Sequence, residues 1–109
     1  GNIKFPFSVS NKERKKLVYC SISNRYFSAY LRFEVLDKPG VLSNITKIFS
    51  KNKVSIKRLI QNPDKFKKNS SIIIITHNSK DKSLNKIIKQ IEKKFYITKR
   101  PKLIRIESN

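Results

Sequence analysis

The hydrophobic pattern changes its period within the stretch Tyr30–Phe49. Before Asp37, apolar residues alternate with polar ones, which is typical of a strand with one buried face. After Gly40, apolar residues recur at steps of three and four, which is typical of a helix that packs one face on a sheet. The apolar stripe of that helix consists of Val41, Leu42, Ile45, Ile48 and Phe49. The stretch therefore predicts a strand, a turn at residues 37–40 and a helix.

The same patterns continue along the chain. A second helix is predicted by an apolar stripe whose spacing follows the helical period. The members of that stripe are Leu84, Ile87, Ile88, Ile91 and Phe95. Polar and turn-forming residues at 62–64 and 67–69 predict a hairpin loop between two strands. The predicted elements are strands from Ser28, at 54–61, 70–77 and 102–107, and helices at 41–51 and 82–95.

This order of elements, βαββαβ, predicts an α+β, ferredoxin-like sandwich in which both helices cover one face of an antiparallel sheet. The third strand contains Ile72–Ile75, an uninterrupted apolar run with side chains on both faces. One face of a lone domain would stay open, so we expect a second copy to cover it and the chain to form a homodimer. A charge at Ile74 is expected to weaken that dimer.

The turn before the first helix is the best candidate for a site. The first turn of a helix leaves backbone N–H groups unpaired and carries positive dipole character, so a small polar ligand can bind there. Pro39 restrains the backbone, and Gly40 lets the backbone approach a ligand closely. Asp37 and Asn44 are candidate acceptors, and Gln61 on the next strand offers an amide donor and acceptor. The alternative interpretation is a plain strand-to-helix turn.

The segment that begins with this strand and turn resembles the start of an ACT domain, a small regulatory module of amino-acid metabolism. The shared opening is the turn Asp37-Lys38-Pro39-Gly40-Val41-Leu42. Together with YLR from Tyr30, SI from Ser55, IQ from Ile60 and ITH from Ile75, it is similar to the C-terminal ACT segment of homoserine dehydrogenase over residues 26–107.

The resemblance implies a connector at residues 1–27, which follows a catalytic domain, and an ACT domain at 28–109. It implies an amino-acid effector, with threonine expected, bound at a subunit boundary. The implied effector-binding residues are Asp37, Pro39, Gly40, Val41, Leu42, Asn44 and Gln61. It also implies that the parent chain is a cytoplasmic NAD(P)-dependent homoserine dehydrogenase of threonine, methionine and isoleucine biosynthesis. A purely structural dimerisation module is the alternative that stays open.

Composition narrows the chemistry of this chain. Its 109 residues include two glycines, so no glycine-rich nucleotide-binding motif can be written in it, and we expect neither dehydrogenase activity nor nicotinamide binding. Cys20 and His77 are the only residues of their types, which leaves no catalytic group and no metal site to propose. Because no apolar run approaches the length of a membrane span, a membrane partner is not expected.

The formal charge of +19 first suggests a polyanionic partner. The lysines are spread along the whole chain, which favours a solvated surface, and steering of an anionic ligand is the second interpretation. An RNA-binding βαββαβ domain would need aromatic residues on its middle strands. The third strand has isoleucines there, and Tyr30 and Phe33 fall on opposite faces of the first, so nucleic acid is not expected as a partner.

Overall fold

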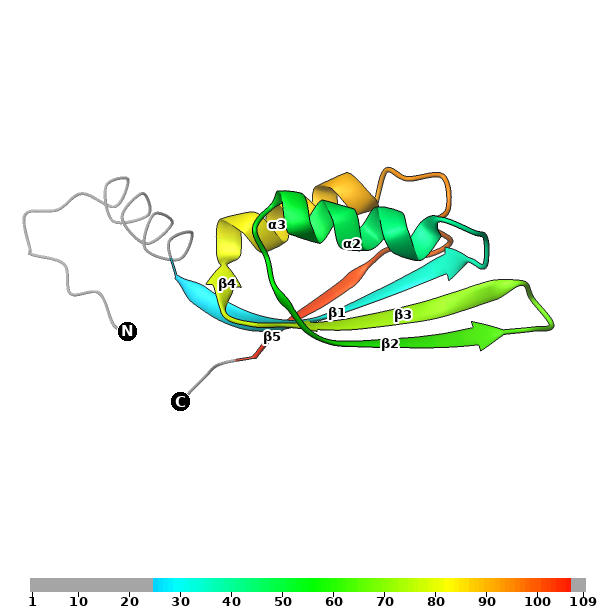
Figure 1. Ribbon diagram of the computed structural model, residues 1–109, viewed down its shortest axis with the longest axis horizontal. Coiled ribbons are helices and arrows are strands. Elements are labelled where there is room, and N and C mark those ends of the chain that lie inside the picture. The colour runs from blue at the N-terminus through cyan, green and yellow to red at the C-terminus, as the bar shows by residue number, and fades with distance from the viewer. Residues whose placement is uncertain (1–24, 107–109) are drawn as a thin grey trace, which may run out of the picture.

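A computed structural model describes residues 25–106, in which two helices lie on the same side of an antiparallel sheet (Figure 1). Its elements are β1 (Tyr26–Leu36), α2 (Val41–Lys51), β2 (Ile56–Asp64), β3 (Asn69–Thr76), β4 (Ser79–Lys80), α3 (Asp81–Ile91) and β5 (Lys102–Ile106). The predicted α+β, ferredoxin-like βαββαβ order is confirmed, with the two-residue β4 added. Of the expected connector, residues 1–24, which include Cys20, lie outside the described part.

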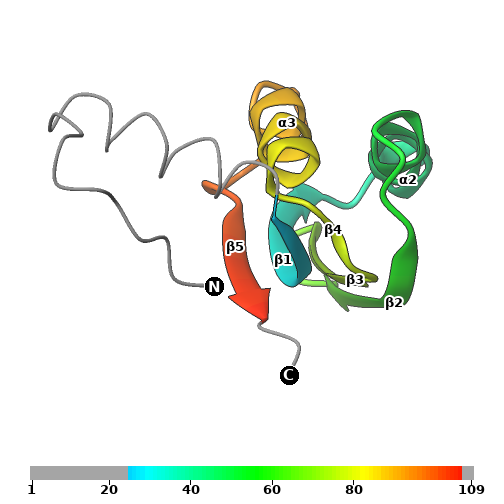
Figure 2. The ribbon, with the colours of Figure 1, turned by 90° about the vertical axis from the view of Figure 1, so that its left-hand side faces the viewer.

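β1 is the central strand of the sheet. It pairs with β3 on one side and with β5 on the other, and β2 forms the edge beyond β3. Viewed along the strands, the sheet runs β5, β1, β3, β2 beneath the two helices (Figure 2). Leu31 faces Ile74 on β3 and Leu103 on β5 across the ladder, so these three residues share the helix side.

The core lies between this sheet face and the helices. Alternate residues of β1 and β3 point into it because successive side chains of a strand point to opposite faces. Phe33 of β1 and Phe49 of α2 meet edge to face, with ring centroids 6.2 Å apart. The most deeply buried large side chains are Phe33, Phe49, Leu31, Ile45, Ile72, Ile74, Leu84, Ile87 and Ile91.

The other face of the sheet is uncovered by any described element (Figure 1). Its centre is apolar, as the third-strand pattern predicted. The side chains there are Tyr30, Ile60, Ile73, Ile75, Ile104 and Ile106. The choice of Ile74 to probe this face was wrong, because Ile74 is fully buried on the helix side. Ile73 and Ile75, one residue to either side, carry the outer face.

Thr76 marks the end of β3, where the strand breaks before β4. Its hydroxyl oxygen accepts a hydrogen bond of 3.1 Å from the backbone N–H of Ala29, and its carbonyl accepts one of 2.6 Å from the hydroxyl of Ser28. The side chain therefore replaces a missing backbone acceptor at the break. Beyond it, β4 resumes the pairing with β1 at Phe27 and Tyr26.

Two boundaries differ from prediction by three residues or more, and smaller differences include the start of β1 at Tyr26 rather than Ser28, inside the expected connector. β2 continues through Pro63 to Asp64, so the hairpin loop is residues 65–68 rather than 62–69. Pro63 is tolerated because β2 is an edge strand, where a residue need not donate to a second neighbour. α3 ends at Ile91 and not at Phe95, because the backbone of residues 96–98 bonds to β1: Leu36 N–H donates to Tyr96 O (2.8 Å).

Candidate functional site

The turn between β1 and α2 is held by the neighbouring hairpin. The backbone N–H of Asp37 donates a 2.8 Å hydrogen bond to the carbonyl of Lys68, and that of Lys38 donates one of 3.0 Å to the carbonyl of Leu36. Gly40 then takes a φ of 87°, in the left-handed region that favours glycine, and α2 begins at Val41. The turn thus has a defined backbone conformation before any ligand is considered.

The first turn of α2 leaves donors free, as predicted. No side chain caps this end of the helix. Among the hydrogen bonds of residues 25–106, the Val41 N–H donates a long 3.3 Å bond to Lys38 O, while the N–H groups of Leu42 and Ser43 find no acceptor. Such unpaired amides at a helix N-terminus attract an anion. Because the Val41 side chain is buried in the core, only its backbone faces this site.

Within one copy, Gly40 is required for its backbone conformation. A Cβ at this position would meet no heavy atom within 4 Å, so within one copy no close backbone approach requires glycine. The positive φ requires it instead. Pro39, the preceding residue, is exposed.

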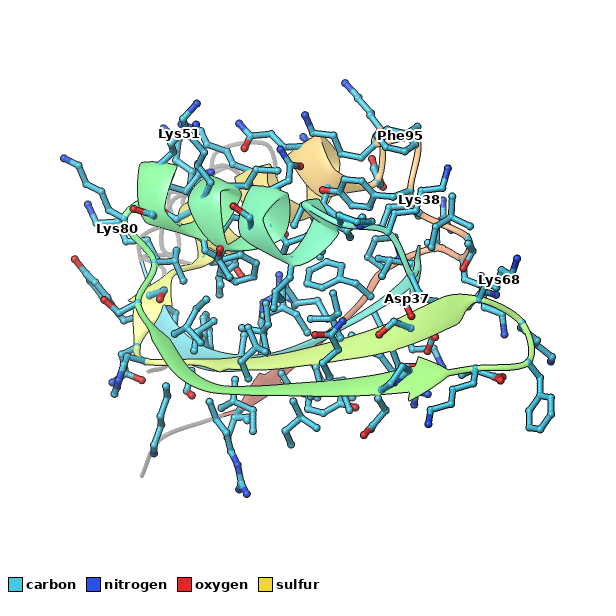
Figure 3. All side chains as sticks on the ribbon, turned by 45° about the vertical axis from the view of Figure 1, so that its right-hand side comes forward. Asp37, Lys38, Lys51, Lys68, Lys80 and Phe95 are labelled. Atoms are coloured by element: carbon cyan, nitrogen blue, oxygen red, sulfur yellow. The ribbon has the colours of Figure 1, made fainter. Side chains whose placement is uncertain are left out.

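Asp37 is exposed at the same end of the molecule. Its carboxylate forms no hydrogen bond or ion pair with the part of the chain that the structure describes, so it is available to a ligand ammonium. Lys38 follows it, with its ammonium 5.8 Å from the centroid of the Phe95 ring. Figure 3 shows Asp37, Lys38, Lys68 and Phe95 gathered at one end, away from Lys51 and Lys80.

The side chain of Asn44 already forms a hydrogen bond within the fold. Its Oδ1 accepts a hydrogen bond of 2.6 Å from the phenol of Tyr96. The predicted contact of Asn44 with the ammonium or hydroxyl of a ligand would use the same Oδ1 atom, so a ligand would compete with the Tyr96 phenol for it. Tyr96 was missed because the helical period pointed to Phe95, which is 76% exposed, whereas Tyr96 is 2% exposed. Burial raises the pKa of the Tyr96 phenol above its ordinary value of 10.0, so it remains a donor.

Gln61 lies far from this turn within one copy. It pairs with Ile72 on β3, which pairs in turn with Phe33 of β1, so two strand spacings and four residues separate it from Asp37. Standard strand geometry makes that about 16 Å. Gln61 is exposed on the edge strand. Nearer the start of β2, a hollow of about 500 Å³ lies between that strand and the end of α2, lined by Ser50, Lys53, Ser55 and neighbouring residues.

The other features considered in the sequence are His77, a metal site, a membrane-spanning helix and the aromatic residues of β1. His77 is exposed, and its backbone N–H donates to the carbonyl of Ser55. Over residues 25–106 no group of three or more His, Cys, Asp or Glu side chains could hold a metal ion, and no described helix is long and apolar enough to cross a membrane. Tyr30 and Phe33 do lie on opposite faces of β1, and Phe33 is buried, so these two rings do not form a pair on one face.

Comparison with known sequences identifies the same region. Residues 31–99 match the family model of the AHAS small subunit-like ACT domain. The homoserine dehydrogenase of Methylobacillus glycogenes is 39% identical over 72 residues, which is 65% of this chain and 17% of that protein. The homoserine dehydrogenase of Helicobacter pylori is 30% identical over 79 residues, which is 72% of this chain and 19% of that protein. The chain thus spans about a fifth of the curated relatives that it matches.

Solved structures agree with this match. A homoserine dehydrogenase from Thiobacillus denitrificans superposes with a TM-score of 0.70 at 30% identity, covering 79% of this chain and 19% of that one. The ACT domain from GTP pyrophosphokinase of Chlorobium tepidum superposes with a TM-score of 0.58 at 18% identity, covering 74% of this chain and 99% of that one. The second likeness concerns the fold alone.

Proposed function

Because the chain belongs to the AHAS small subunit-like ACT domains, we propose that it is the effector-binding module of a homoserine dehydrogenase and that its effector is a free amino acid, threonine. The parent enzyme would carry a separate NAD(P)-dependent catalytic domain and act in the cytoplasm, in the synthesis of threonine, methionine and isoleucine from aspartate. The relatives named homoserine dehydrogenase support this parentage.

One observation carries the proposal: the uncapped start of α2 lies beside an uncommitted carboxylate. The N–H groups of Leu42 and Ser43 are donors for the carboxylate of an amino acid. The Asp37 carboxylate is an acceptor for its ammonium. These two groups recognise the carboxylate and the ammonium, which all free amino acids share. The side chain of the effector must therefore be recognised by other residues.

A second copy supplies the other wall in this proposal. Gln61 cannot reach the turn of its own copy, but it lies on an edge strand whose outer side is unpaired among the described elements. Pairing of that edge with another copy would bring the Gln61 amide to the partner's effector. The amide offers both a donor and an acceptor to the hydroxyl of threonine. The homodimer is thus part of the site.

Inhibition requires the effector to distinguish two arrangements of the dimer. A ligand that binds both arrangements equally shifts nothing, whereas a difference of ~1–3 kcal/mol is the usual scale of coupling between sites. The activity of the catalytic domain would then depend on which arrangement of the dimer is more populated.

A thermal shift assay with threonine, methionine, isoleucine, lysine and serine at millimolar concentration tests the proposal. Threonine should raise the Tm of the chain, and Asp37→Asn should abolish the shift. Glu92→Gln is the matched control, because it removes one exposed carboxylate elsewhere and should leave the shift intact. The same panel on the full-length enzyme, read as loss of activity, completes the test. No response in either assay would reject amino-acid sensing.

The open face supports a second candidate, a purely structural dimerisation module. Ile104 is 58% exposed and Ile106 is 42% exposed, next to the partly exposed Tyr30, Ile73 and Ile75. Such an apolar sheet face is typical of an interface. Sedimentation of the chain, alone and with Ile73→Glu, tests this candidate: a dimer dissociated by Ile73→Glu supports it, and a monomer at high concentration and moderate salt counts against it.

A further inference from the structure

A polar hollow of about 220 Å³ lies near the hairpin end of the sheet, and its lining includes no residue of the turn at 37–40 or of α2. It is formed where β1, the β2–β3 hairpin and the segment before β5 meet, and we call it the hairpin pocket. Every residue that lines it is polar or charged, among them Arg32, Glu34, Asp64, Lys67, Ser71 and Lys99. Its volume is below the roughly 300–1,000 Å³ of pockets for drug-sized ligands, which suits a ligand of few atoms.

Both carboxylates of the hairpin pocket accept hydrogen bonds within the fold, Glu34 on both oxygens and Asp64 on one. Glu34 accepts a hydrogen bond from Arg32 Nε at 2.7 Å on one oxygen and from the Ser71 hydroxyl at 2.5 Å on the other. Asp64 accepts the backbone N–H groups of Phe66 and Lys67 on its Oδ1, at 3.1 and 3.4 Å. This second pair of bonds shapes the hairpin turn. Glu34, with donors on both oxygens, is therefore a poor candidate for binding a cationic ligand.

The cationic side chains of the pocket, in contrast, keep hydrogen-bond donors that no carboxylate of the fold accepts. Arg32 bonds to Glu34 through Nε alone, and its two terminal nitrogens donate to no carboxylate of residues 25–106. Lys67 and Lys99 form no ion pair with any described residue. The Ser71 hydrogen bond, with the charges of Arg32 and Lys99, lowers the pKa of Glu34, which places the Lys99 charge near this carboxylate. Three cations thus line the pocket with two acids that already accept hydrogen bonds, so positive charge and hydrogen-bond donors are in excess there.

The geometry points to a second ligand site: the hairpin pocket binds a small oxyanion, either a phosphate or a carboxylate group, on Arg32, Lys67 and Lys99. The planar guanidinium of Arg32 suits a two-point contact with such a group, and the lysines supply charge from the hairpin and from the segment before β5. Ser71, by holding Glu34, keeps Arg32 oriented. This site shares no residue with the proposed effector site at the turn and does not depend on the proposed amino-acid effector.

The test is a titration of the ¹⁵N-labelled chain with inorganic phosphate and, in a second arm, with acetate, at constant ionic strength, followed by ¹H–¹⁵N correlation spectra. Saturable one-to-one shifts confined to the amides around Arg32, Lys67, Ser71 and Lys99 are expected in at least one arm. The arm that saturates identifies the oxyanion. Shifts spread over the lysine-bearing surface without saturation, in both arms, would overturn the proposal.

Variants separate a built site from general attraction to a chain of charge +19. Lys67→Gln with Lys99→Gln should weaken binding at least tenfold. Lys47→Gln with Lys86→Gln removes the same charge from the exposed sides of α2 and α3 and should change affinity less than twofold. Arg32→Lys keeps the charge but loses the planar fork, and should weaken binding at least threefold. Equal losses in the two double variants would overturn the proposal.

Discussion

The phenol of Tyr96 donates a 2.6 Å hydrogen bond to Oδ1 of Asn44, joining the segment after α3 to the first turn of α2. The two residues are 52 positions apart in the sequence. The backbone of Tyr96 also accepts the N–H of Leu36, the last residue of β1. One residue thereby fixes both sides of the turn that carries Asp37 and Gly40, so the candidate effector site is supported from outside its own segment.

Tyr96→Phe should lower the free energy of unfolding by about 1 kcal/mol, because it removes a hydrogen bond and leaves the Asn44 acceptor without its donor. Burial raises the pKa of this phenol above 10.0, so its stabilising effect is complete below pH 10 and is lost as the pH rises through the raised value. Urea unfolding from neutral to strongly alkaline pH measures both effects. An identical alkaline decline in Tyr96→Phe would contradict this account.

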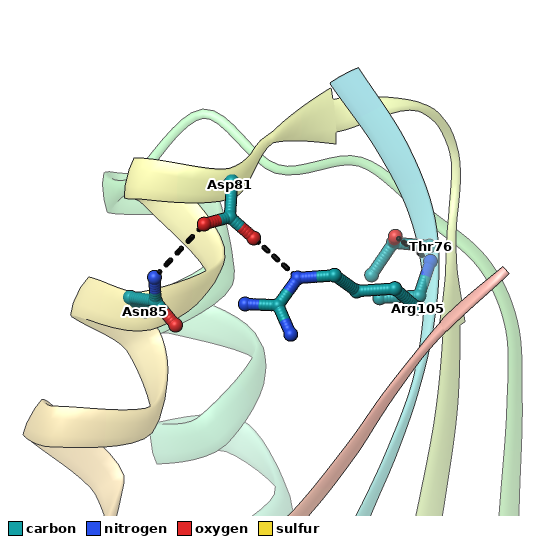
Figure 4. A network of polar contacts seen from close by, with 5 residues as sticks. Thr76, Asp81, Asn85 and Arg105 are labelled. Atoms are coloured by element: carbon teal, nitrogen blue, oxygen red, sulfur yellow. Dashed lines mark hydrogen bonds and ion pairs between the residues drawn. The ribbon is translucent and has the colours of Figure 1, made fainter. Parts of the chain in front are cut away.

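The buried carboxylate of Asp81 ties β5 to the start of α3 (Figure 4). It accepts hydrogen bonds from Arg105 Nε and from Asn85 Nδ2, and its side chain is 6% exposed. Asp81→Asn should cost about 1–3 kcal/mol, below the usual cost of breaking a fully buried pair, because Arg105 is 39% exposed and can be rehydrated. Glu92→Gln, on the surface, is the control with the same change of charge. Equal melting points for the two variants would argue against a stabilising role for the interactions of Asp81 with Arg105 and Asn85.

Glu34 should make the stability depend on acid pH. The Ser71 hydrogen bond, ahead of the contributions from Arg32, lowers its pKa below the ordinary value of 4.5. The carboxylate therefore stabilises the fold above pH 4.5, and this stabilisation is lost as the pH falls through the lowered pKa. Unfolding curves of the chain and of Glu34→Gln should converge in acid. Curves that stay parallel would rule out this role.

Ser70 and Ser71 are adjacent on β3 but should respond in opposite ways to alanine. The Ser70 hydroxyl is buried and has no hydrogen-bond partner among the described residues, so Ser70→Ala should be neutral or stabilising by up to about 1 kcal/mol. Ser71→Ala removes the hydrogen bond to Glu34 and should destabilise by about 1 kcal/mol. Chemical denaturation of the two variants side by side decides the matter. Destabilisation by Ser70→Ala would mean that its hydroxyl has a partner.

Gly40→Ala should cost about 1–2 kcal/mol through backbone strain alone, since φ is 87° and a Cβ would meet no neighbour within 4 Å. Gly40→Asn should cost less, because asparagine tolerates the left-handed region better. Melting temperatures of the two variants give the comparison. Equal losses for Ala and Asn would instead indicate a steric role for the glycine, for example against a second copy.

Much of the candidate site was local and therefore readable in the sequence. The free N–H groups at the start of α2 follow from Pro39-Gly40 placed before an apolar helical stripe, and Asp37 lies in the same short segment. The hydrogen bond of Asn44 with Tyr96 could not be predicted from the sequence, because Tyr96 comes from a distant segment of the chain. The hairpin pocket was equally hidden. Its cations Arg32, Lys67 and Lys99 belong to three segments that meet only in the folded sheet.

The sequence by itself determined the elements whose signals lie within one turn or one strand. α2 occupies residues 41–51 as predicted, because a glycine with positive φ and a period of 3.6 define it locally. The tertiary structure alone decided where α3 ends, since two hydrogen bonds with β1, one accepted by the Tyr96 carbonyl and one donated by the Thr98 N–H, compete with further helical turns. It also decided which isoleucines of β3 face the helices. An uninterrupted apolar run carries no period, so only the pairing of Ile74 with Leu31 settles its face.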